Sequence, residues 1–294
     1  MRHLFSTLTT QLLRYITLCV SGIIVFSSLH DALATSALDH RVARQPTSTV
    51  HVVTIPVESD YIITTEITAN LTPIIDFATR NNAIAAINGG YFDPQNGKTT
   101  SYITQQGNLV ADPRTNERLI DNPDLKPYLG KILNRAQFRR YQCGAATRYD
   151  ITARTAAIPN GCIVLDALGA GPQLLPVDTS VAEGFTAYED GKLIRDAIGR
   201  EALNARSAIA ITEGGDVIFA MVQQQNSTDS GMSLPELAAF LRSLGATKAM
   251  NLDGGSSSSL YYQGETYYGK LDSEGDRVQR PLKSVLLVRS QNNK

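Results

Sequence analysis

Two distant segments of the chain share one order of local signals, and this repetition constrains the possible folds more than any other feature. In each segment, a predicted helix leads into a short apolar strand and then into a polar residue followed by two glycines. The strands are predicted at residues 83–87 and 248–252, and the turns at residues 88–90 (Asn-Gly-Gly) and 253–255 (Asp-Gly-Gly). If both strands lie side by side in one sheet, both turns leave its carboxyl edge, where open sheets with helical crossovers bind ligands. The sequence therefore predicts a site at these turns.

The helices of these two units carry recognisable start and stop signals. Thr72 is the predicted N-cap of the first helix and Pro73 its first residue, and the helix is expected to run to about Asn81. The second begins at residues 233–236 (Ser-Leu-Pro-Glu), the pattern of a capping box, and Gly245 ends it. Helices are therefore few, and strands supply most of the expected fold.

Strand signals separated by turns recur along the rest of the chain. The clearest runs are at residues 50–57, 61–68, 206–212, 216–222 and 284–288. The first two runs and the next two runs are each predicted to pair as a hairpin, because only a few polar or glycine residues separate them. Since no segment is low in complexity, a single domain over residues 48–290 is expected.

Composition excludes several classes of function. The 294 residues include 27 basic and 28 acidic side chains, so a net charge of −1 offers no field for a nucleic-acid backbone. The four histidines, of which His51 is the last, all lie near the N-terminus. A Ser-His-Asp triad or a His-rich zinc site in the body of the chain is therefore excluded. Carboxylates, arginine, lysine, hydroxyls and the backbone are left to perform any chemistry.

The N-terminal segment has the layout of a secretory signal peptide. Arg2 and Arg14 precede a mostly apolar run at residues 16–29, and residues 32–34 (Ala-Leu-Ala) form a small-x-small cleavage pattern. The run is shorter than the about 20 residues that span a membrane comfortably. Residues 1–34 are therefore expected to be a cleaved signal peptide, with a retained anchor as the alternative.

The mature chain is accordingly expected in the periplasm or outside the cell, with no stable membrane span. Residues 35–47 show no steady period and are expected to form a flexible leader. Two cysteines remain after cleavage, Cys143 and Cys162, an even number that suits an oxidising compartment. A disulfide between them is predicted, with two independent thiols as the alternative.

The Asp-Gly-Gly turn carries the main catalytic candidate. Asp253 follows an apolar strand, so its carboxylate could be a general acid, a nucleophile or a metal ligand. Gly254 and Gly255 lack Cβ atoms and let backbone N–H groups face an anion, while Ser256 and Ser257 add hydroxyls. The alternative is an ordinary turn rich in glycine and serine.

The Asn-Gly-Gly turn supplies further candidates. Asn88 offers an amide, and Tyr91 or Phe92 could face a sugar ring, because the chain has no tryptophan. Asp93 is a candidate second carboxylate, although before Pro94 it could equally be a turn residue.

Arg206 begins a β-branched strand and is the candidate for binding an anion. Its planar guanidinium suits a phosphate or a carboxylate, because it can donate two parallel hydrogen bonds. A structural ion pair at the end of a strand is the alternative.

Five segments in this order resemble the phosphodiester glycosidase family. They are NGGYFDP at 88–94, GAGPQLL at 169–175, ARSAIAIT at 205–212, GMSLPELAAFLRSLGA at 231–246 and NLDGGSSSSL at 251–260. The family includes the lysosomal uncovering enzyme, which removes N-acetylglucosamine from mannose 6-phosphate, and many exported bacterial proteins. The resemblance covers roughly residues 50–289, and the paired Asx-Gly-Gly motifs are its most specific part.

The resemblance implies an α+β fold with a mixed, strongly twisted β-sheet and a few packed helices. It also implies hydrolysis of a sugar-1-phosphate diester. The residues that fall on family motif positions are Asn88, Gly89, Gly90, Phe92, Gly171, Arg206, Asp253, Gly254, Gly255, Ser256 and Ser257. The chain departs from the family pattern at Ala205, Ser207 and Ala210, where the family often has Pro, Thr and Gly.

The leading hypothesis is an exported glycosidase that cleaves the glycosidic C–O bond of a phosphorylated glycan. Arg206 and the Gly-Ser turn would hold the phosphate, Asn88 would orient sugar hydroxyls, and Asp253 would act as acid, base or nucleophile, with Asp93 as second carboxylate. No cofactor is expected, although a divalent metal at Asp253 stays open. The alternatives are a non-catalytic module that binds envelope glycans and a metal-dependent phosphodiesterase.

Overall fold

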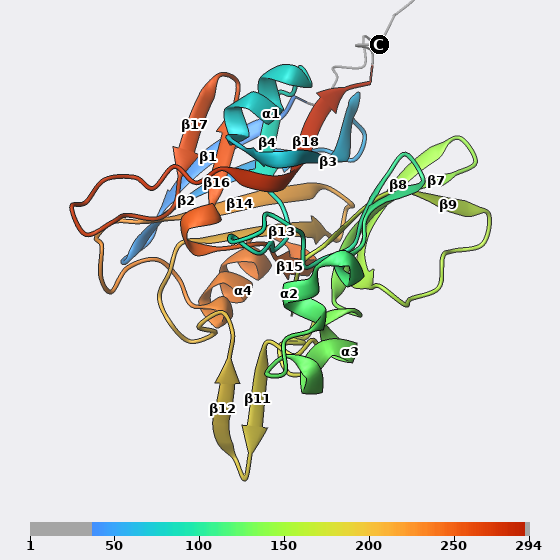
Figure 1. Ribbon diagram of the computed structural model, residues 1–294. Helices are drawn as coiled ribbons and strands as arrows, with labels where there is room; N and C mark the ends of the chain where they lie inside the picture. The colour runs from blue at the N-terminus through green and yellow to red at the C-terminus, as the bar shows by residue number, and fades with distance from the viewer. Residues whose placement is uncertain (1–36, 292–294) are drawn as a thin grey trace, which may run out of the picture. The chain divides into compact units, whose positions relative to one another are not determined.

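The computed structural model describes residues 37–291, and the predicted signal peptide lies outside them. Most strands lie in three sheets, and one further hairpin stands apart from them (Figure 1). Every pairing between named strands is antiparallel.

The three sheets draw their strands from distant parts of the chain. The first has the order β1 (Asp39–Arg44), β2 (Ser48–Ile55), β14 (Val217–Gln224), β13 (Arg206–Thr212), β15 (Ala246–Asn251), β10 (Gln173–Leu175). The second has the order β17 (Glu265–Tyr268), β16 (Ser259–Tyr262), β4 (Ala85–Asn88), β18 (Leu282–Ser290), β3 (Tyr61–Thr72). The third has the order β6 (Asn108–Ala111), β5 (Ile103–Gln105), β9 (Cys162–Gly169), β7 (Ala136–Cys143), β8 (Ala146–Ala153). The separate hairpin pairs β11 (Thr186–Glu189) with β12 (Lys192–Asp196).

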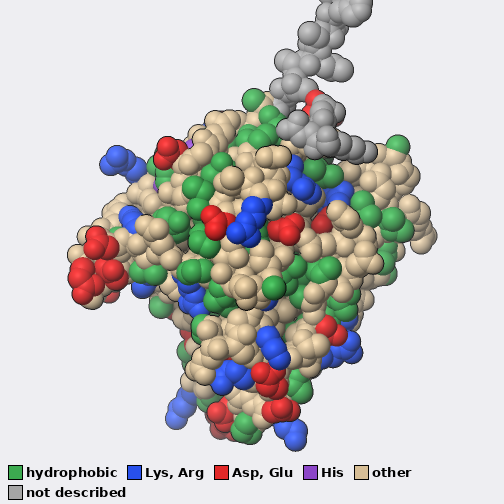
Figure 2. All heavy atoms as spheres, turned by 45° about the horizontal axis from the view of Figure 1, so that its top comes forward, with side chains coloured by type: hydrophobic (Ala, Val, Ile, Leu, Met, Phe, Trp, Pro, Cys, Tyr) green, Lys and Arg blue, Asp and Glu red, His purple; other side chains and the backbone are tan. Residues whose placement is uncertain are grey.

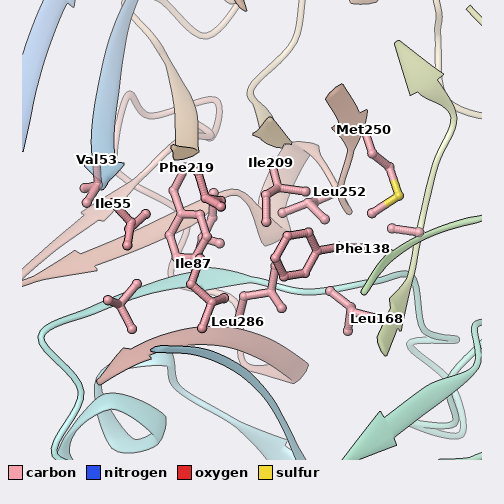
Figure 3. Close-up of a cluster of buried hydrophobic side chains, with 14 of the residues drawn as sticks. Val53, Ile55, Ile87, Phe138, Leu168, Ile209, Phe219, Met250, Leu252 and Leu286 are labelled. Carbon is pink, nitrogen blue, oxygen red and sulfur yellow. The ribbon is translucent and has the colours of Figure 1, made fainter. Parts of the chain in front are cut away.

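The main hydrophobic core lies where the three sheets face one another (Figure 3). Phe219 of β14 and Ile209 of β13 extend from the first sheet, Ile87 of β4 from the second, and Phe138 of β7 and Leu168 of β9 from the third. All five side chains are almost fully buried. Because residues from all three sheets contribute to one core, the sheets stabilise one another.

The described residues form four α-helices, of which the first and the last pack on sheets. They are α1 (Ile74–Arg80), α2 (Glu117–Ile120), α3 (Leu129–Ile132) and α4 (Leu234–Ser243), with 3₁₀ turns η1 (Pro113–Thr115), η2 (Lys126–Tyr128) and η3 (Gly255–Ser257). Leu234, Leu237 and Leu241 of α4 pack on the first sheet. Ile74 and Phe77 of α1 pack on the second sheet. α1 and α4 therefore each bury one apolar stripe, as amphipathic helices on a sheet do.

The start of α4 matches its prediction, whereas the start of α1 does not. The Ser233 Oγ accepts a hydrogen bond from the Glu236 N–H (3.3 Å), and the Glu236 carboxylate accepts one from the Ser233 N–H (2.8 Å), which confirms the capping box. In α1, Pro73 occupies the N-cap position and no side chain caps the helix. The Thr72 hydroxyl instead donates to the Asn70 carbonyl (3.1 Å).

The expectation of a single mixed sheet is wrong. The chain is rich in strands, but they form three antiparallel sheets, and the two helix–strand units belong to different ones. β4 lies in the second sheet and β15 in the first, so neither helix connects neighbouring parallel strands. The local signals predict each unit correctly, yet they carry no information about the sheet to which each strand adds.

One of the two predicted hairpins is also wrong. Val217–Gln224 pairs with Arg206–Thr212 as predicted. Ser48–Ile55 and Tyr61–Thr72, however, lie in the first and second sheets. Between them, the Val57 N–H donates to the Asp216 carboxylate (2.9 Å). This contact holds the connection against the β13–β14 turn, and β3 continues into the other sheet.

The predicted flexible leader contains a strand. Asp39–Arg44 forms β1 and pairs with β2 at the edge of the first sheet. Three of its six side chains are exposed and none is fully buried, so backbone hydrogen bonds to β2 hold it together with the ring contacts of His40. A strand of this kind leaves no apolar alternation in the sequence, which explains why the prediction missed it.

The predicted disulfide is present. Cys143 and Cys162 face each other on β7 and β9, with their Cα atoms 4.1 Å apart. The bond closes a loop with a sequence separation of 19 residues. Among the helices between residues 37 and 291, none has the length and apolar character needed to cross a membrane.

Candidate active site

The two Asx-Gly-Gly turns meet, although their strands belong to different sheets. The Asn88 Nδ2 donates to the Asp253 carbonyl (2.6 Å), and the Asp253 N–H donates to the Gly89 carbonyl (3.1 Å). The Asn88 Oδ1 also accepts from the Ser259 N–H (3.1 Å). Both ends of this buried amide thus bind backbone, and Asn88 joins the turns instead of facing a sugar, which corrects the role expected for it.

A cavity of about 210 Å³ opens beside the joined turns. It is lined by Tyr91, Ile198, Asn204, Arg206, Asn251, Asp253, Gly254, Gly255 and Ser256. The structure therefore brings together the predicted Arg206, Asp253 and the Gly-Gly-Ser turn. Asn88, Gly89, Gly90, Phe92, Asp93, Gly171 and Ser257 lie outside the lining.

Asp253 is the one carboxylate in this lining. Burial raises its pKa from 3.8 to about 6, although the Ser257 hydroxyl, the Arg280 charge and the Gly254 N–H act in the opposite direction. A carboxyl group with this pKa exchanges protons near neutral pH. Asp253 can therefore serve as an acid, a base or a nucleophile without a histidine.

Arg206 is buried with only 2% of its surface exposed, and its guanidinium binds backbone carbonyls. The Nε donates to Met232 (3.0 Å), the Nη1 to Ile198 (2.9 Å), and the Nη2 to Gly199 (2.6 Å) and Ala202 (2.7 Å). These bonds leave one Nη1 hydrogen, so the planar fork is not available to a phosphate. The bidentate role expected for Arg206 is therefore corrected.

The charge of Arg206 nevertheless acts on the cavity. Its hydrogen-bond partners within residues 37–291 include no carboxylate. Burial lowers its pKa, whereas Tyr91 and Asp196 raise it. A buried cation without a bonded counterion attracts an anion strongly, because the surroundings screen it poorly.

Tyr91 and Asn251 form the polar floor of the cavity. The Tyr91 hydroxyl donates to the Gly171 carbonyl (2.8 Å) and accepts from the Asn251 Nδ2 (2.8 Å). The Asn251 Oδ1 is buried and has no partner among the described residues. A buried acceptor without a partner costs free energy, so the Asn251 side chain has unused hydrogen-bonding capacity next to the cavity.

Two further cations lie next to lining residues. The Arg280 Nη1 donates to the Ser256 Oγ (2.8 Å), and the Arg280 guanidinium lies 4.9 Å from the ring centre of Phe92. The Lys270 Nζ donates to the Asn204 Oδ1 (3.4 Å). Phe92 therefore supports an arginine beside the Gly-Ser turn and is not a lining residue.

Asp93 lies in a turn outside the cavity. Its Oδ2 accepts from the Arg118 Nε (2.7 Å), and its Oδ1 accepts from the Gln95 N–H (2.8 Å). Both oxygens are thus engaged in the turn before Gly97, whose N–H binds the Asp93 carbonyl. The expectation of a second catalytic carboxylate at Asp93 is not supported, and its turn alternative fits the structure.

The glycines outside the lining permit close packing. A Cβ on Gly90 would lie 2.2 Å from the Gly169 carbonyl oxygen, and one on Gly89 would lie 2.4 Å from the Ser284 Oγ. Gly171 has a φ of +100°, and a Cβ there would lie 2.1 Å from the Glu183 Oε2. No larger residue fits at these positions without movement of the backbone or of Glu183.

The sequence interpretation missed Ile198, Asn204 and Asn251. The first two lie in the irregular segment between β12 and β13, which carries no periodic signal. Asn251, a polar residue at the end of the apolar strand β15, could have been found by the same reasoning that identified Asn88.

A metal site needs several ligands close together, and the described residues contain no such group of side chains. Within residues 37–291, no three His, Cys, Asp or Glu side chains come close enough to hold an ion. Acidic side chains do gather at the tip of the loop between β17 and β18 (Figure 2). There the Asp272 Oδ1 accepts hydrogen bonds from the Glu274 N–H (3.1 Å) and the Asp276 N–H (2.8 Å), so it stabilises its own turn.

The sequence model described as "Phosphodiester glycosidase" matches residues 81–289, which include both Asx-Gly-Gly turns and every lining residue of the cavity. The chain belongs to the phosphodiester glycosidase family. No curated protein matches this chain in sequence.

Solved structures share the fold of this chain. One is the catalytic domain of the zebrafish N-acetylglucosamine-1-phosphodiester alpha-N-acetylglucosaminidase, auto-inhibited by its pro-peptide, at 18% identity and a TM-score of 0.61, covering 86% of this chain and 82% of that one. A hypothetical protein from Synechocystis matches at 18% identity and a TM-score of 0.56, covering 85% of this chain but only 61% of that one. A putative exported protein from Burkholderia pseudomallei matches at 18% identity and a TM-score of 0.53, covering 82% and 74%.

Proposed function

We propose that this phosphodiester glycosidase hydrolyses the glycosidic C–O bond of a sugar-1-phosphate diester, releasing the sugar and a phosphomonoester. The observation that carries the proposal is the pairing of one carboxyl group of raised pKa, Asp253, with the buried cation Arg206 in a small cavity. The carboxyl group supplies the proton chemistry, and the cation favours a substrate with a negative charge.

A single carboxylate is sufficient for this reaction. Ordinary glycosidases use two, because an alkoxide is a poor leaving group and needs a proton. A phosphomonoester leaves more readily and needs less protonation. As a base, Asp253 takes one proton from a water whose oxygen bonds to the anomeric carbon, while the C–O electrons leave with the phosphate. As a nucleophile, its oxygen bonds to that carbon while the phosphomonoester leaves with the C–O electrons, and water then cleaves the ester to Asp253, giving the sugar, the free carboxylate and a proton.

The phosphate is held mainly by charge and not by a fork. Arg206 contributes its charge and one Nη1 hydrogen, and Arg280 lies beside Ser256 with a guanidinium that makes one hydrogen bond. Opposite charges attract most strongly where burial reduces screening. Asn251 supplies the acceptor for a sugar hydroxyl.

Export is part of the same proposal. The predicted signal peptide and the disulfide both suit a compartment outside the cytoplasm. The substrate is then a phosphorylated glycan of the envelope or the surroundings. The zebrafish enzyme is named for N-acetylglucosamine, and that sugar is one candidate among several here.

The decisive experiment is hydrolysis of a sugar-1-phosphodiester in ¹⁸O-water. We expect the label in the sugar, because water attacks the anomeric carbon. Label in the phosphate, with loss of turnover in chelator, would identify a metal-dependent phosphodiesterase. Binding without turnover of any diester would identify a glycan-binding module. Asp93→Asn is the matched control for Asp253→Asn, since it makes the same chemical change outside the cavity.

A further inference from the structure

A second cavity, of about 530 Å³, lies at the other end of β4 from the joined turns. Val288 of β18 is paired with Ala85, the first residue of β4, whereas Val285 is paired with Asn88, its last. The second cavity is lined by residues that follow Val288 and by residues that precede Ala85. It shares no lining residue with the first cavity, and the length of β4 separates them by about 13 Å.

The lining of this second cavity is rich in cations. Arg80 at the end of α1, Arg140 of β7 and Arg289 of β18 all line it, and no carboxylate does. Figure 1 shows α1, β3 and the end of β18 at the same upper edge of the molecule. Residues far apart in sequence are thus brought together as a group of three guanidinium groups.

Two buried polar groups in this lining have unused hydrogen-bonding capacity. The Arg140 Nε and Nη2 bind the Asp166 Oδ2, and within residues 37–291 its Nη1 has no hydrogen-bond partner. The Thr64 Oγ1 is buried without a partner in the same part of the chain, and Thr64 is only 5% exposed. Because buried polar groups are normally satisfied, the unpartnered Thr64 hydroxyl points to a missing ligand, and the Arg140 Nη1 is a further donor in the same lining.

Arg289 provides the least compensated of the three charges. Its guanidinium donates no hydrogen bond to another described residue, although its charge acts on Glu66 of β3, whose pKa it lowers. The Glu66 carboxylate itself accepts a hydrogen bond from the Gln105 Nε2 (3.2 Å). Arg80 is mostly exposed and only weakly paired with Asp76, at 3.9 Å. The guanidinium of Arg289 is therefore free to bind a ligand.

We propose that this cavity is a second binding site, which takes an oxyanion group carried on a small saccharide. The arginine side chains and the Thr64 hydroxyl would bind the anionic group, because arginine matches the geometry of phosphate and carboxylate. Amide side chains at the rim, Asn82 and Gln106, offer donors and acceptors to sugar hydroxyls. The cavity is within the size range of ordinary small-molecule sites. The inference does not depend on the hydrolytic activity proposed above.

The test is a titration of the mature protein with inorganic phosphate and with glucose 1-phosphate, followed by amide NMR. We expect shifts at Thr64, Asn82 and Arg289, separate from shifts at Gly254 and Ser256. Arg289→Gln should weaken binding at the second cavity by about 10-fold, the loss typical of one charge-assisted hydrogen bond, and leave the first unchanged. Arg280→Gln, the matched control, should do the reverse.

Thr64→Val provides a second variant that preserves the fold. Valine has nearly the same shape, so removal of an unpartnered hydroxyl should not lower the free energy of unfolding. Binding of phosphate at the second cavity should still weaken. The proposal would be overturned if Thr64, Asn82 and Arg289 showed no shifts. It would also be overturned if Arg289→Gln and Thr64→Val bound phosphate at the second cavity as tightly as the wild type. Equal affinities for phosphate and glucose 1-phosphate would refute its saccharide part.

Discussion

Replacement of Arg206 by lysine separates a role in stability from a role in binding. Arg206→Lys keeps the positive charge but replaces a planar group that makes four hydrogen bonds with an ammonium that has three hydrogens. At least one of the carbonyls of Ile198, Gly199, Ala202 and Met232 therefore loses its partner. Because the three hydrogens of lysine lie on one nitrogen and reach a smaller region, we expect two carbonyls to lose theirs.

The magnitude follows from the cost of such losses. One or two buried carbonyls without partners destabilise the fold by about 2–5 kcal/mol. For a chain of this size, the melting temperature should fall by roughly 5–15 °C. The segment that supplies Ile198 to the cavity wall should loosen as well, so kcat/KM should fall together with stability.

Thermal unfolding followed by circular dichroism measures the effect, with Arg280→Lys as the control. Arg280 is less buried and makes one side-chain hydrogen bond, so the control should melt close to the wild type. If Arg206→Lys also melts at the wild-type temperature, the carbonyl contacts do not hold the loop, and Arg206 would return to its simpler role as a phosphate ligand.

Three more outcomes are expected. Asp253→Asn should lower kcat/KM at least about 100-fold. The variant should be no less stable than wild type at neutral pH, because burial raises the pKa of Asp253 and disfavours its ionised form. The difference in the free energy of unfolding between the two proteins should shrink as the pH falls below about 6. Wild-type turnover in a folded variant would exclude a catalytic Asp253. If Asp253 works ionised, wild-type kcat/KM should fall as the pH drops through about 6, and Arg280→Gln should move the midpoint to higher pH, since the Arg280 charge lowers this pKa; an unmoved midpoint would contradict the electrostatic contact. Thiol titration should find no free cysteine in the native mature protein, and reduction of Cys143–Cys162 should lower the free energy of unfolding by about 3 kcal/mol; two reactive thiols before reduction would contradict the bridge.

The sequence predicted those elements that depend on residues close together along the chain. The capping box of α4 and the β13–β14 hairpin depend on residues within a few positions of one another. Asp253 was identified for the same reason, because a carboxylate between an apolar strand and two glycines is visible in a short stretch of sequence. The disulfide followed from the parity of cysteines.

The sequence could not predict the contacts that depend on long-range arrangement. Arg206 looked like an anion ligand because the sequence does not show which groups its guanidinium binds. Those groups are backbone carbonyls, which every residue has, so no sequence pattern distinguishes them. Asn88 looked like a sugar ligand because its partner, the Asp253 carbonyl, is 165 positions away. Asp93 was ambiguous until its contact with Arg118 placed it in a turn.

The bond from Asn88 to the Asp253 carbonyl means that the proposed catalytic site needs two turns that lie 165 positions apart in the sequence. The proposed proton-transfer group sits on a turn that is fixed by another turn from a different sheet, made from the opposite part of the polypeptide. Both turns must therefore be synthesised, and their two sheets must fold, before Asp253 reaches its place beside Asn88. A chain truncated before Asp253 would lack the proposed proton-transfer group even with β4 and Asn88 in place.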